Sequence, residues 1–170
     1  MSKDLSPVLE FSVGDAMRQF RMVPLQTSDG PALLAVHSAC AEVDPYHRMF
    51  FIPTDTLKLT AVSLAGERLW RRDLGPGVIP GVWFCPVLPY DIDQNGFDDV
   101  YCVSNSDPEH PLDHESYVLD RMSADDGTVM QSFPWPGVAF GQEISHTYRN
   151  FINAGQSRGE RRLITCQGTY

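Results

Sequence analysis

The sequence predicts an all-β protein built from four-stranded antiparallel sheets. Three observations predict this class: short apolar runs rich in β-branched and aromatic residues, frequent turn residues, and an internal repeat. Glycine and proline each occur 13 times among 170 residues, more often than a helical protein would tolerate. The hydrophobic fraction of 42% allows a core, and the length suits a single domain over residues 1–170.

The repeat is visible as three stretches that align on a glycine. The glycines are 66 and 63 residues apart, at Gly30, Gly96 and Gly159. Each is followed, four residues later, by the first apolar residue of an expected strand. These residues are Leu34, Val100 and Leu163. We therefore expect each repeat to begin with a strand, a turn and a second strand.

A second series completes the unit, because residues 57–70 resemble residues 117–130. Both read as a strand, a tight turn at Gly66 or Gly127, and another strand. Four antiparallel strands per unit are typical of the blade of a β-propeller. The units are expected at about residues 16–75, 82–136 and 144–170, which makes a partial propeller of about two and a half blades. Such a chain is either a piece of a longer propeller or completes a ring by association; the alternative is an open β-sheet array or sandwich.

The most distinctive segment is residues 91–100, Asp-Ile-Asp-Gln-Asn-Gly-Phe-Asp-Asp-Val. Oxygen-bearing side chains occupy alternate positions, and Gly96 allows a sharp turn. Ca²⁺ takes about six to eight oxygen ligands from flexible loops. The spacing therefore predicts Ca²⁺ as a cofactor, and it resembles an EF-hand loop up to the ninth position. The expected ligands are the side chains of Asp91, Asp93, Asn95 and Asp99 and the carbonyl oxygen of Phe97.

The other repeats make a similar turn without these ligands. The corresponding residues are Leu25, Thr27 and Asp29 in the first unit and Ala154, Gln156 and Arg158 in the third. The turn itself does not need a metal, so the carboxylates of the middle unit are a specialisation. Close carboxylates repel one another unless a cation neutralises them. The alternative is a solvated acidic turn with Asn-Gly hairpin chemistry.

Two segments together carry a family resemblance. Residues 69–75, Leu-Trp-Arg-Arg-Asp-Leu-Gly, followed by the aspartate loop, resemble the blades of rhamnogalacturonan lyases, which are calcium-containing β-propellers. The resemblance covers about residues 57–136 and extends to other propeller-type polysaccharide lyases, including ulvan lyases. Asn95 stands where the family has a third aspartate, and those lyases are several times longer. The loop alone also resembles the FG-GAP repeats of integrin-type propellers.

The lyase resemblance implies cleavage of uronate-containing glycans by β-elimination. That reaction needs a base, an acid, and a cation or arginine on the substrate carboxylate. Two polar segments, 105–114 and 142–150, contain such groups. The candidate catalytic residues are His110, His146, Tyr148 and Arg149. The alternative is that His110 is a surface residue and that the others only cap a sheet; the chain would then be a non-catalytic, FG-GAP-like calcium-stabilised binding or structural module.

Charge and hydropathy limit the partners. The formal charge of −9 argues against a nucleic acid or an anionic membrane, which both require a basic face. The sequence contains no run of about 18 apolar residues, so no membrane span is expected. The first residues also lack the apolar segment of a signal peptide. We therefore expect a cytoplasmic protein, and the lyase resemblance implies a polysaccharide or oligosaccharide substrate. The four cysteines lack a Cys-x-x-Cys pair and are expected as thiols, with a Cys85–Cys102 disulfide as the alternative for an exported protein.

Overall fold

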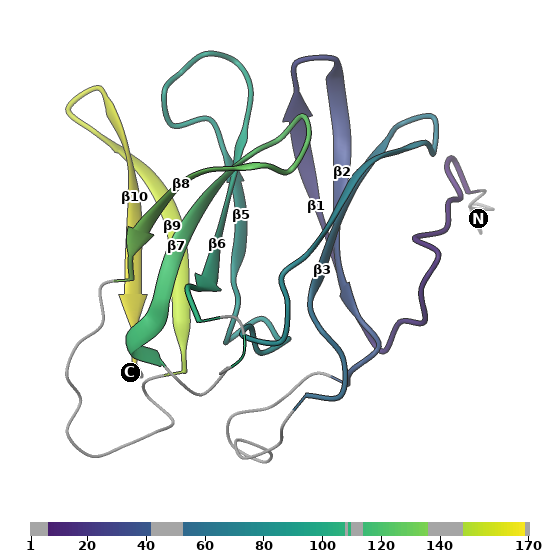
Figure 1. The fold of residues 1–170 in the computed structure, drawn as a ribbon. Coiled ribbons are helices and arrows are strands. Elements are labelled where there is room, and N and C mark those ends of the chain that lie inside the picture. Colours follow the sequence, from purple (N-terminus) through teal and green to yellow (C-terminus); the bar gives the residue numbers. More distant parts are fainter. Residues whose placement is uncertain (1–6, 42–52, 108, 110–113, 136–147, 169–170) are drawn as a thin grey trace, which may run out of the picture.

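The computed structural model describes residues 7–41, 53–107, 109, 114–135 and 148–168. These residues form three antiparallel sheets (Figure 1). The first has the order β1-β2-β3-β4, with strands at Gln19–Thr27, Gly30–Ser38, Lys58–Ser63 and Arg68–Asp73. The second has the order β5-β6-β7-β8, with strands at Val87–Tyr90, Asp99–Asn105, Tyr117–Ser123 and Val129–Pro134. The third pairs β9 with β10, at Asn150–Ser157 and Glu160–Gln167.

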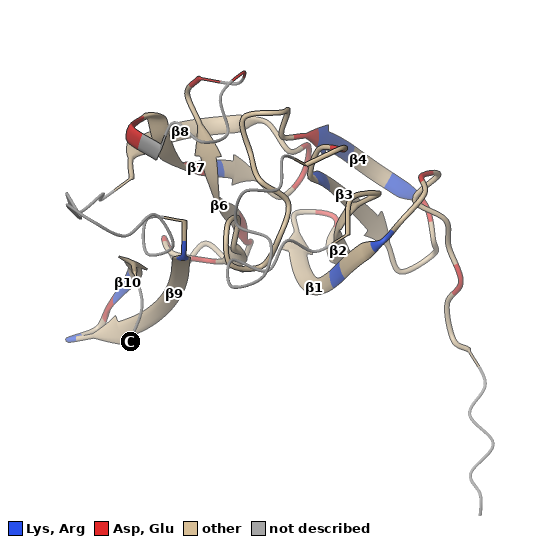
Figure 2. Cartoon of the chain, turned by 90° about the horizontal axis from the view of Figure 1, so that it is seen from below, with Lys and Arg blue, Asp and Glu red and all other residues tan. Residues whose placement is uncertain are grey.

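The predicted all-β class is confirmed. Within the described ranges, helix is limited to one 3-10 turn, η1, at His114–Ser116. None of the helical structure described is long and apolar enough to cross a membrane. The first strands of successive sheets are neighbours, because β1 contacts β5 and β5 contacts β9. The sheets therefore fan out from their first strands, an arrangement compatible with consecutive blades of a partial propeller (Figures 1 and 2).

Apart from Gly30, which begins β2, the predicted turn glycines lie between strands and have positive φ. Gly96 has a φ of 93° between β5 and β6, and Gly159 has a φ of 85° between β9 and β10. The second pair of repeats agrees in more detail. Gly66 and Gly127 lie in the β3–β4 and β7–β8 hairpins, and each hairpin has an irregularity in its register. These irregularities fall after Ala61 and after Arg121, so the two residues are structurally equivalent.

The glycine alignment is wrong by one residue in the first unit. Val100 and Leu163 face the preceding sheet, whereas Leu34 faces the following one. The turns explain the difference, because Gly30 already pairs with Thr27 inside the ladder while Gly159 lies in the turn itself. Side chains alternate along a strand, so a shift of one residue moves each side chain to the other face.

The core consists of two apolar clusters, one on each face of the second sheet. On β6, Val100 and Cys102 pack towards the first sheet, whereas Tyr101 and Val103 belong to the cluster next to the third sheet. Both faces of this sheet are therefore buried, which explains why β6 is apolar at consecutive positions. Cys85 and Cys102 are free, buried thiols, and the Cys85 thiol donates to the carbonyl of Val103 at 3.0 Å.

Polar contacts also join the first and second sheets. The indole nitrogen of Trp70 on β4 donates to the carbonyl of Ala124 at 2.7 Å. Gln26 on β1 and Asp98 in the aspartate loop form two further contacts. The Gln26 amide donates to the Asp98 carboxylate, and the Asp98 amide donates to the Gln26 carbonyl, both at 2.8 Å. Asp98 is thereby directed towards β1, and its burial raises the pKa of its carboxyl group. Each contact compensates these polar groups for the hydration that they lose when the sheets pack.

The outer face of the first sheet contains a buried histidine. His37 on β2 has no exposed surface, and its Nε2 lies 3.0 Å from the hydroxyl of Thr60 on β3. Its Nδ1 lies 3.8 Å from the carboxylate of Asp15, which pairs with Arg71 on β4 at 2.8 Å. The segment that precedes β1 is therefore held on this face through Asp15.

We expect this histidine to make stability depend on pH. Burial, opposed in part by Asp15 and reinforced by Arg71 and Lys58, lowers the pKa of His37 below 6.5. Below pH 6.5 the unfolded chain then binds more protons than the folded one, so the free energy of unfolding decreases as the pH falls. Urea unfolding of the protein and of His37→Gln, measured from neutral to mildly acidic pH, tests this. Equal pH slopes for both proteins would contradict it.

Candidate functional site

The two ends of the sheets differ in their connections (Figure 1). Hairpin turns within the sheets lie at one end, which we call the turn end; it includes the aspartate loop between β5 and β6. The strand termini that the β2–β3, β4–β5, β6–β7 and β8–β9 connections join lie at the other end, which we call the loop end. The seven residues of β6 separate the two ends by roughly 20 Å. The predicted metal loop therefore lies at the opposite end from Tyr148 and Arg149, which directly precede β9.

The aspartate loop is organised by its own side chains. The carboxylate of Asp91 accepts the backbone amides of Asn95 at 3.0 Å and Gly96 at 3.1 Å. The side chain of Asn95 accepts the amide of Phe97 at 2.8 Å. Although desolvation acts in the opposite direction, the Gly96 amide and the Arg161 guanidinium lower the pKa of Asp91. The loop is therefore built to keep this carboxylate ionised.

Arg121 and Arg161, which no sequence motif pointed to, contact three of the four predicted ligand side chains. Arg121 on β7 contacts Asp99 through Nε at 2.7 Å and through Nη2 at 2.6 Å. The same Nη2 lies 3.1 Å from Asp93. Arg161, on β10 of the next sheet, lies 2.9 Å from the carboxylate of Asp91, also donates to its carbonyl oxygen, and stacks 5.6 Å from the ring centre of Tyr90.

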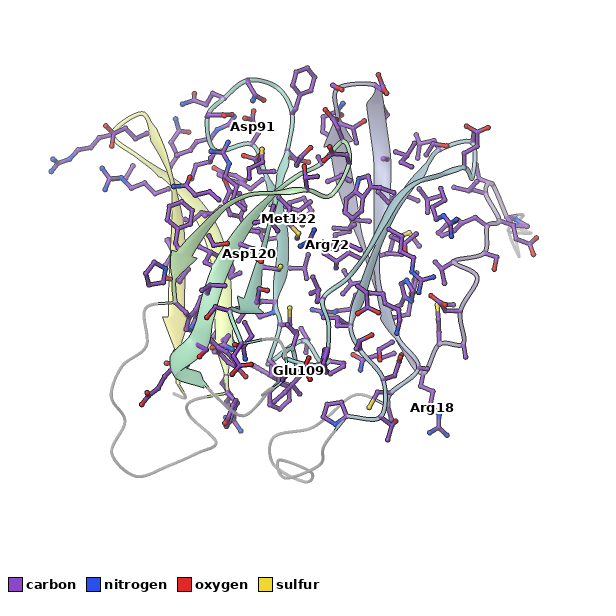
Figure 3. The ribbon with its side chains drawn as sticks, viewed as in Figure 1. Arg18, Arg72, Asp91, Glu109, Asp120 and Met122 are labelled. Carbon is purple, nitrogen blue, oxygen red and sulfur yellow. The ribbon has the colours of Figure 1, made fainter. Side chains whose placement is uncertain are left out.

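The donor set of this loop matches the chemistry of Ca²⁺, because all its groups are oxygens. Guanidinium groups contact three of these carboxylates. Within the ranges that the structure describes, no group of three or more His, Cys, Asp or Glu side chains is placed to hold a metal ion. The carboxylates would have to turn away from the two arginines to converge on one ion. Figure 3 shows Asp91 in the loop at the turn end, far from Glu109 at the loop end.

At the loop end, Tyr148 packs against residues of the second sheet and of the β4–β5 connection. The ring of Tyr148, just before β9, lies 6.2 Å from that of Tyr117, which directly follows η1. It also lies 6.4 Å from the ring of Phe84. Both Tyr148 and Arg149 are only 4% exposed, which favours a packing role for them. His110 and His146 lie outside the described residues, so their roles remain predictions.

A cavity that sequence reasoning did not find also opens at the loop end. Its volume is about 270 Å³, and it lies between connections of the first and second sheets. Pro53, Pro76 and Val78 give it apolar walls, and Asp55 and Glu109 contribute carboxylates. Desolvation raises the pKa of Asp55, but hydrogen bonds from Lys58 and the Ala39 amide outweigh it and bring the value to about 2. The residues that line the cavity come from segments far apart in the sequence, and no local motif marks them.

Comparison with solved structures identifies a shared fold. An exotype rhamnogalacturonan lyase, YesX, matches with a TM-score of 0.74 over 91% of this chain and 29% of its own, at 13% identity. The rhamnogalacturonan lyase YesW matches with a TM-score of 0.73 over 91% and 30%, at 14% identity. The rhamnogalacturonan lyase PL11 of Bacillus licheniformis gives 0.64 over 89% and 34%, at 14% identity.

The chain therefore has the fold of a part of rhamnogalacturonan lyases, and it spans about a third of their length. No protein-family model and no curated protein matches the sequence. At this identity the likeness concerns the fold, and the activity has to be argued from residues.

Proposed function

We propose that this chain acts on uronate-containing glycans by β-elimination, as part of a polysaccharide lyase of the propeller type, and that its aspartate loop binds Ca²⁺. The observation that carries the proposal is the shared fold with three rhamnogalacturonan lyases over about nine tenths of the chain. Residues 69–75 and the aspartate loop resemble the same enzymes. The first segment lies in β4 and the two residues after it, and the loop lies between β5 and β6.

In this proposal the two ends of the sheets have separate roles. The loop end carries Tyr148, Arg149 and the cavity beside Glu109. A glycan would bind there, where His110 or His146 would act as the base and an arginine would neutralise the uronate. An ion in the aspartate loop would lie roughly 20 Å away, too far to polarise the substrate. The chemistry that Ca²⁺ supplies there is charge neutralisation within the loop.

The test is release of unsaturated uronate products from rhamnogalacturonan or ulvan in the presence of Ca²⁺, followed by ultraviolet absorbance. Product release is the expected result. The absence of product from every uronate polymer tried would contradict the lyase proposal for this chain.

A matched variant tests the role of Tyr148. Tyr148→Phe keeps the ring that packs on Phe84 and Tyr117 and removes only the hydroxyl group. If the hydroxyl transfers a proton, kcat should fall by about 10²–10⁴-fold with an unchanged melting temperature. Unchanged turnover would assign Tyr148 to packing alone.

The burial of Tyr148 and Arg149 favours one alternative function, a non-catalytic module in which Ca²⁺ only stabilises the loop. This alternative expects EDTA to lower the melting temperature while no glycan is cleaved. An enzyme and a non-catalytic module would both show a melting temperature that depends on Ca²⁺. The product assay is therefore the measurement that separates the two functions.

A further inference from the structure

The charge of the aspartate loop is balanced by two arginines that come from outside it. Arg121 lies on β7 of the same sheet, and Arg161 lies on β10 of the next one. Together they contact Asp91, Asp93 and Asp99 at 2.6–3.1 Å. The Asp99 and Asp91 side chains are only 11% and 16% exposed, so these pairs are partly buried and weakly screened.

The first unit supports a special role for Arg121. The register irregularities of the two hairpins make Ala61 the equivalent of Arg121. The first-unit turn is not an equivalent loop, because Thr27 pairs with Gly30 and leaves only Ser28 and Asp29 between the strands, whereas residues 91–98 lie between Tyr90 and Asp99. The arginine thus occurs in the unit that has the long carboxylate loop, and alanine takes its place in the unit with the short turn.

Guanidinium groups and a divalent cation would compete for the same oxygens. Two N–H groups of Arg121 contact the same oxygen, Oδ2 of Asp99, and thereby engage its charge and its lone pairs. A cation that binds this oxygen must displace the arginine. Conversely, removal of the arginine would leave a partly buried carboxylate next to others of the same sign, which raises the affinity for any cation.

We propose that Arg121 and Arg161 set the cation affinity of the aspartate loop by holding its carboxylates when no Ca²⁺ is bound and releasing them when it binds. This inference rests on the calcium part of the proposed function and is independent of the lyase part. Because Arg161 belongs to the third sheet, exchange of its guanidinium for Ca²⁺ would also loosen the contact between the second and third sheets at the turn end.

The experiment is calorimetric titration of the metal-free full chain with Ca²⁺. Arg121→Gln and Arg161→Gln should each bind Ca²⁺ about tenfold more tightly than the unchanged protein, which corresponds to about 1.4 kcal/mol. Arg162→Gln is the matched control, because Arg162 lies on the same strand, is 64% exposed and pairs with Glu160; its affinity should be unchanged. Arg121→Lys keeps the charge without the planar fork and should give an intermediate affinity.

Melting temperatures in EDTA and in Ca²⁺ supply the second readout and show that each variant folds. The glutamine variants should melt lower than the unchanged protein in EDTA and gain more from Ca²⁺. Equal Ca²⁺ affinity, or weaker binding by the variants, would overturn the competition while leaving the calcium site in place. No binding by any of the five proteins would overturn both the calcium site and the competition; the product assay would still decide the lyase proposal.

Discussion

Trp70→Ala should be among the most destabilising single substitutions in this chain, at about 3–5 kcal/mol. Trp70 is 7% exposed and belongs to the cluster between the first and second sheets. Its removal would leave a cavity at that interface and an unpaired Ala124 carbonyl, which now accepts the indole N–H at 2.7 Å. Urea unfolding of the full chain measures the loss.

Trp83→Ala is the control for this prediction. Trp83 is 37% exposed and makes an edge contact with Phe151 at 5.7 Å between ring centres. Its loss should cost about 1 kcal/mol. Trp70→Phe, which keeps an aromatic ring but loses the hydrogen bond, should fall between the two. A loss for Trp70→Ala no larger than for Trp83→Ala would show that the two sheets do not depend on this contact.

Gly127→Ala should be the second large effect, because it combines strain with a clash. Gly127 has a φ of 71°, which costs a non-glycine residue about 1–2 kcal/mol. A Cβ at this position would also lie 2.7 Å from a ring carbon of Trp70. Overpacking of this kind costs about 1–3 kcal/mol more, so the free energy of unfolding should fall by roughly 2–5 kcal/mol.

Gly159→Ala separates the two causes. Gly159 has a φ of 85° in the β9–β10 turn, and a Cβ there would meet no atom within 4 Å. It should therefore show the strain alone. The clash can be removed independently, because in a Trp70→Ala background Gly127→Ala should cost no more than Gly159→Ala. Equal effects of the two glycine substitutions in the unchanged background would contradict the proposed contact.

The strands and turns of this protein could be predicted because they depend on local patterns. Gly66 and Gly127 mark equivalent hairpins, since the turn needs a positive φ that glycine adopts without strain. The face of each strand was less predictable. Leu34 faces the opposite way from its expected counterpart Val100 because the two turns differ in where the ladder resumes, and one residue decides the face.

The candidate sites likewise contain residues that local patterns indicate and residues that only sheet packing brings to the site. The oxygen pattern of the aspartate loop is a local feature, and its residues were found from spacing alone. Its arginine partners were not, because Arg121 and Arg161 lie 22 and 62 residues beyond Asp99 and reach the loop only through sheet packing. The burial of Tyr148 likewise follows from its contacts with Phe84 and Tyr117, which no pattern within 142–150 indicates.

The sequence by itself determined the all-β class, the repeat and the oxygen-rich loop, because turn chemistry and strand alternation act over a few residues. Only the tertiary structure decided that this loop and Tyr148 lie at opposite ends of the sheets, and that guanidinium groups from two sheets hold the loop carboxylates. Antiparallel pairing is the physical reason: it sends alternate connections to opposite ends and brings charges together that are distant along the chain.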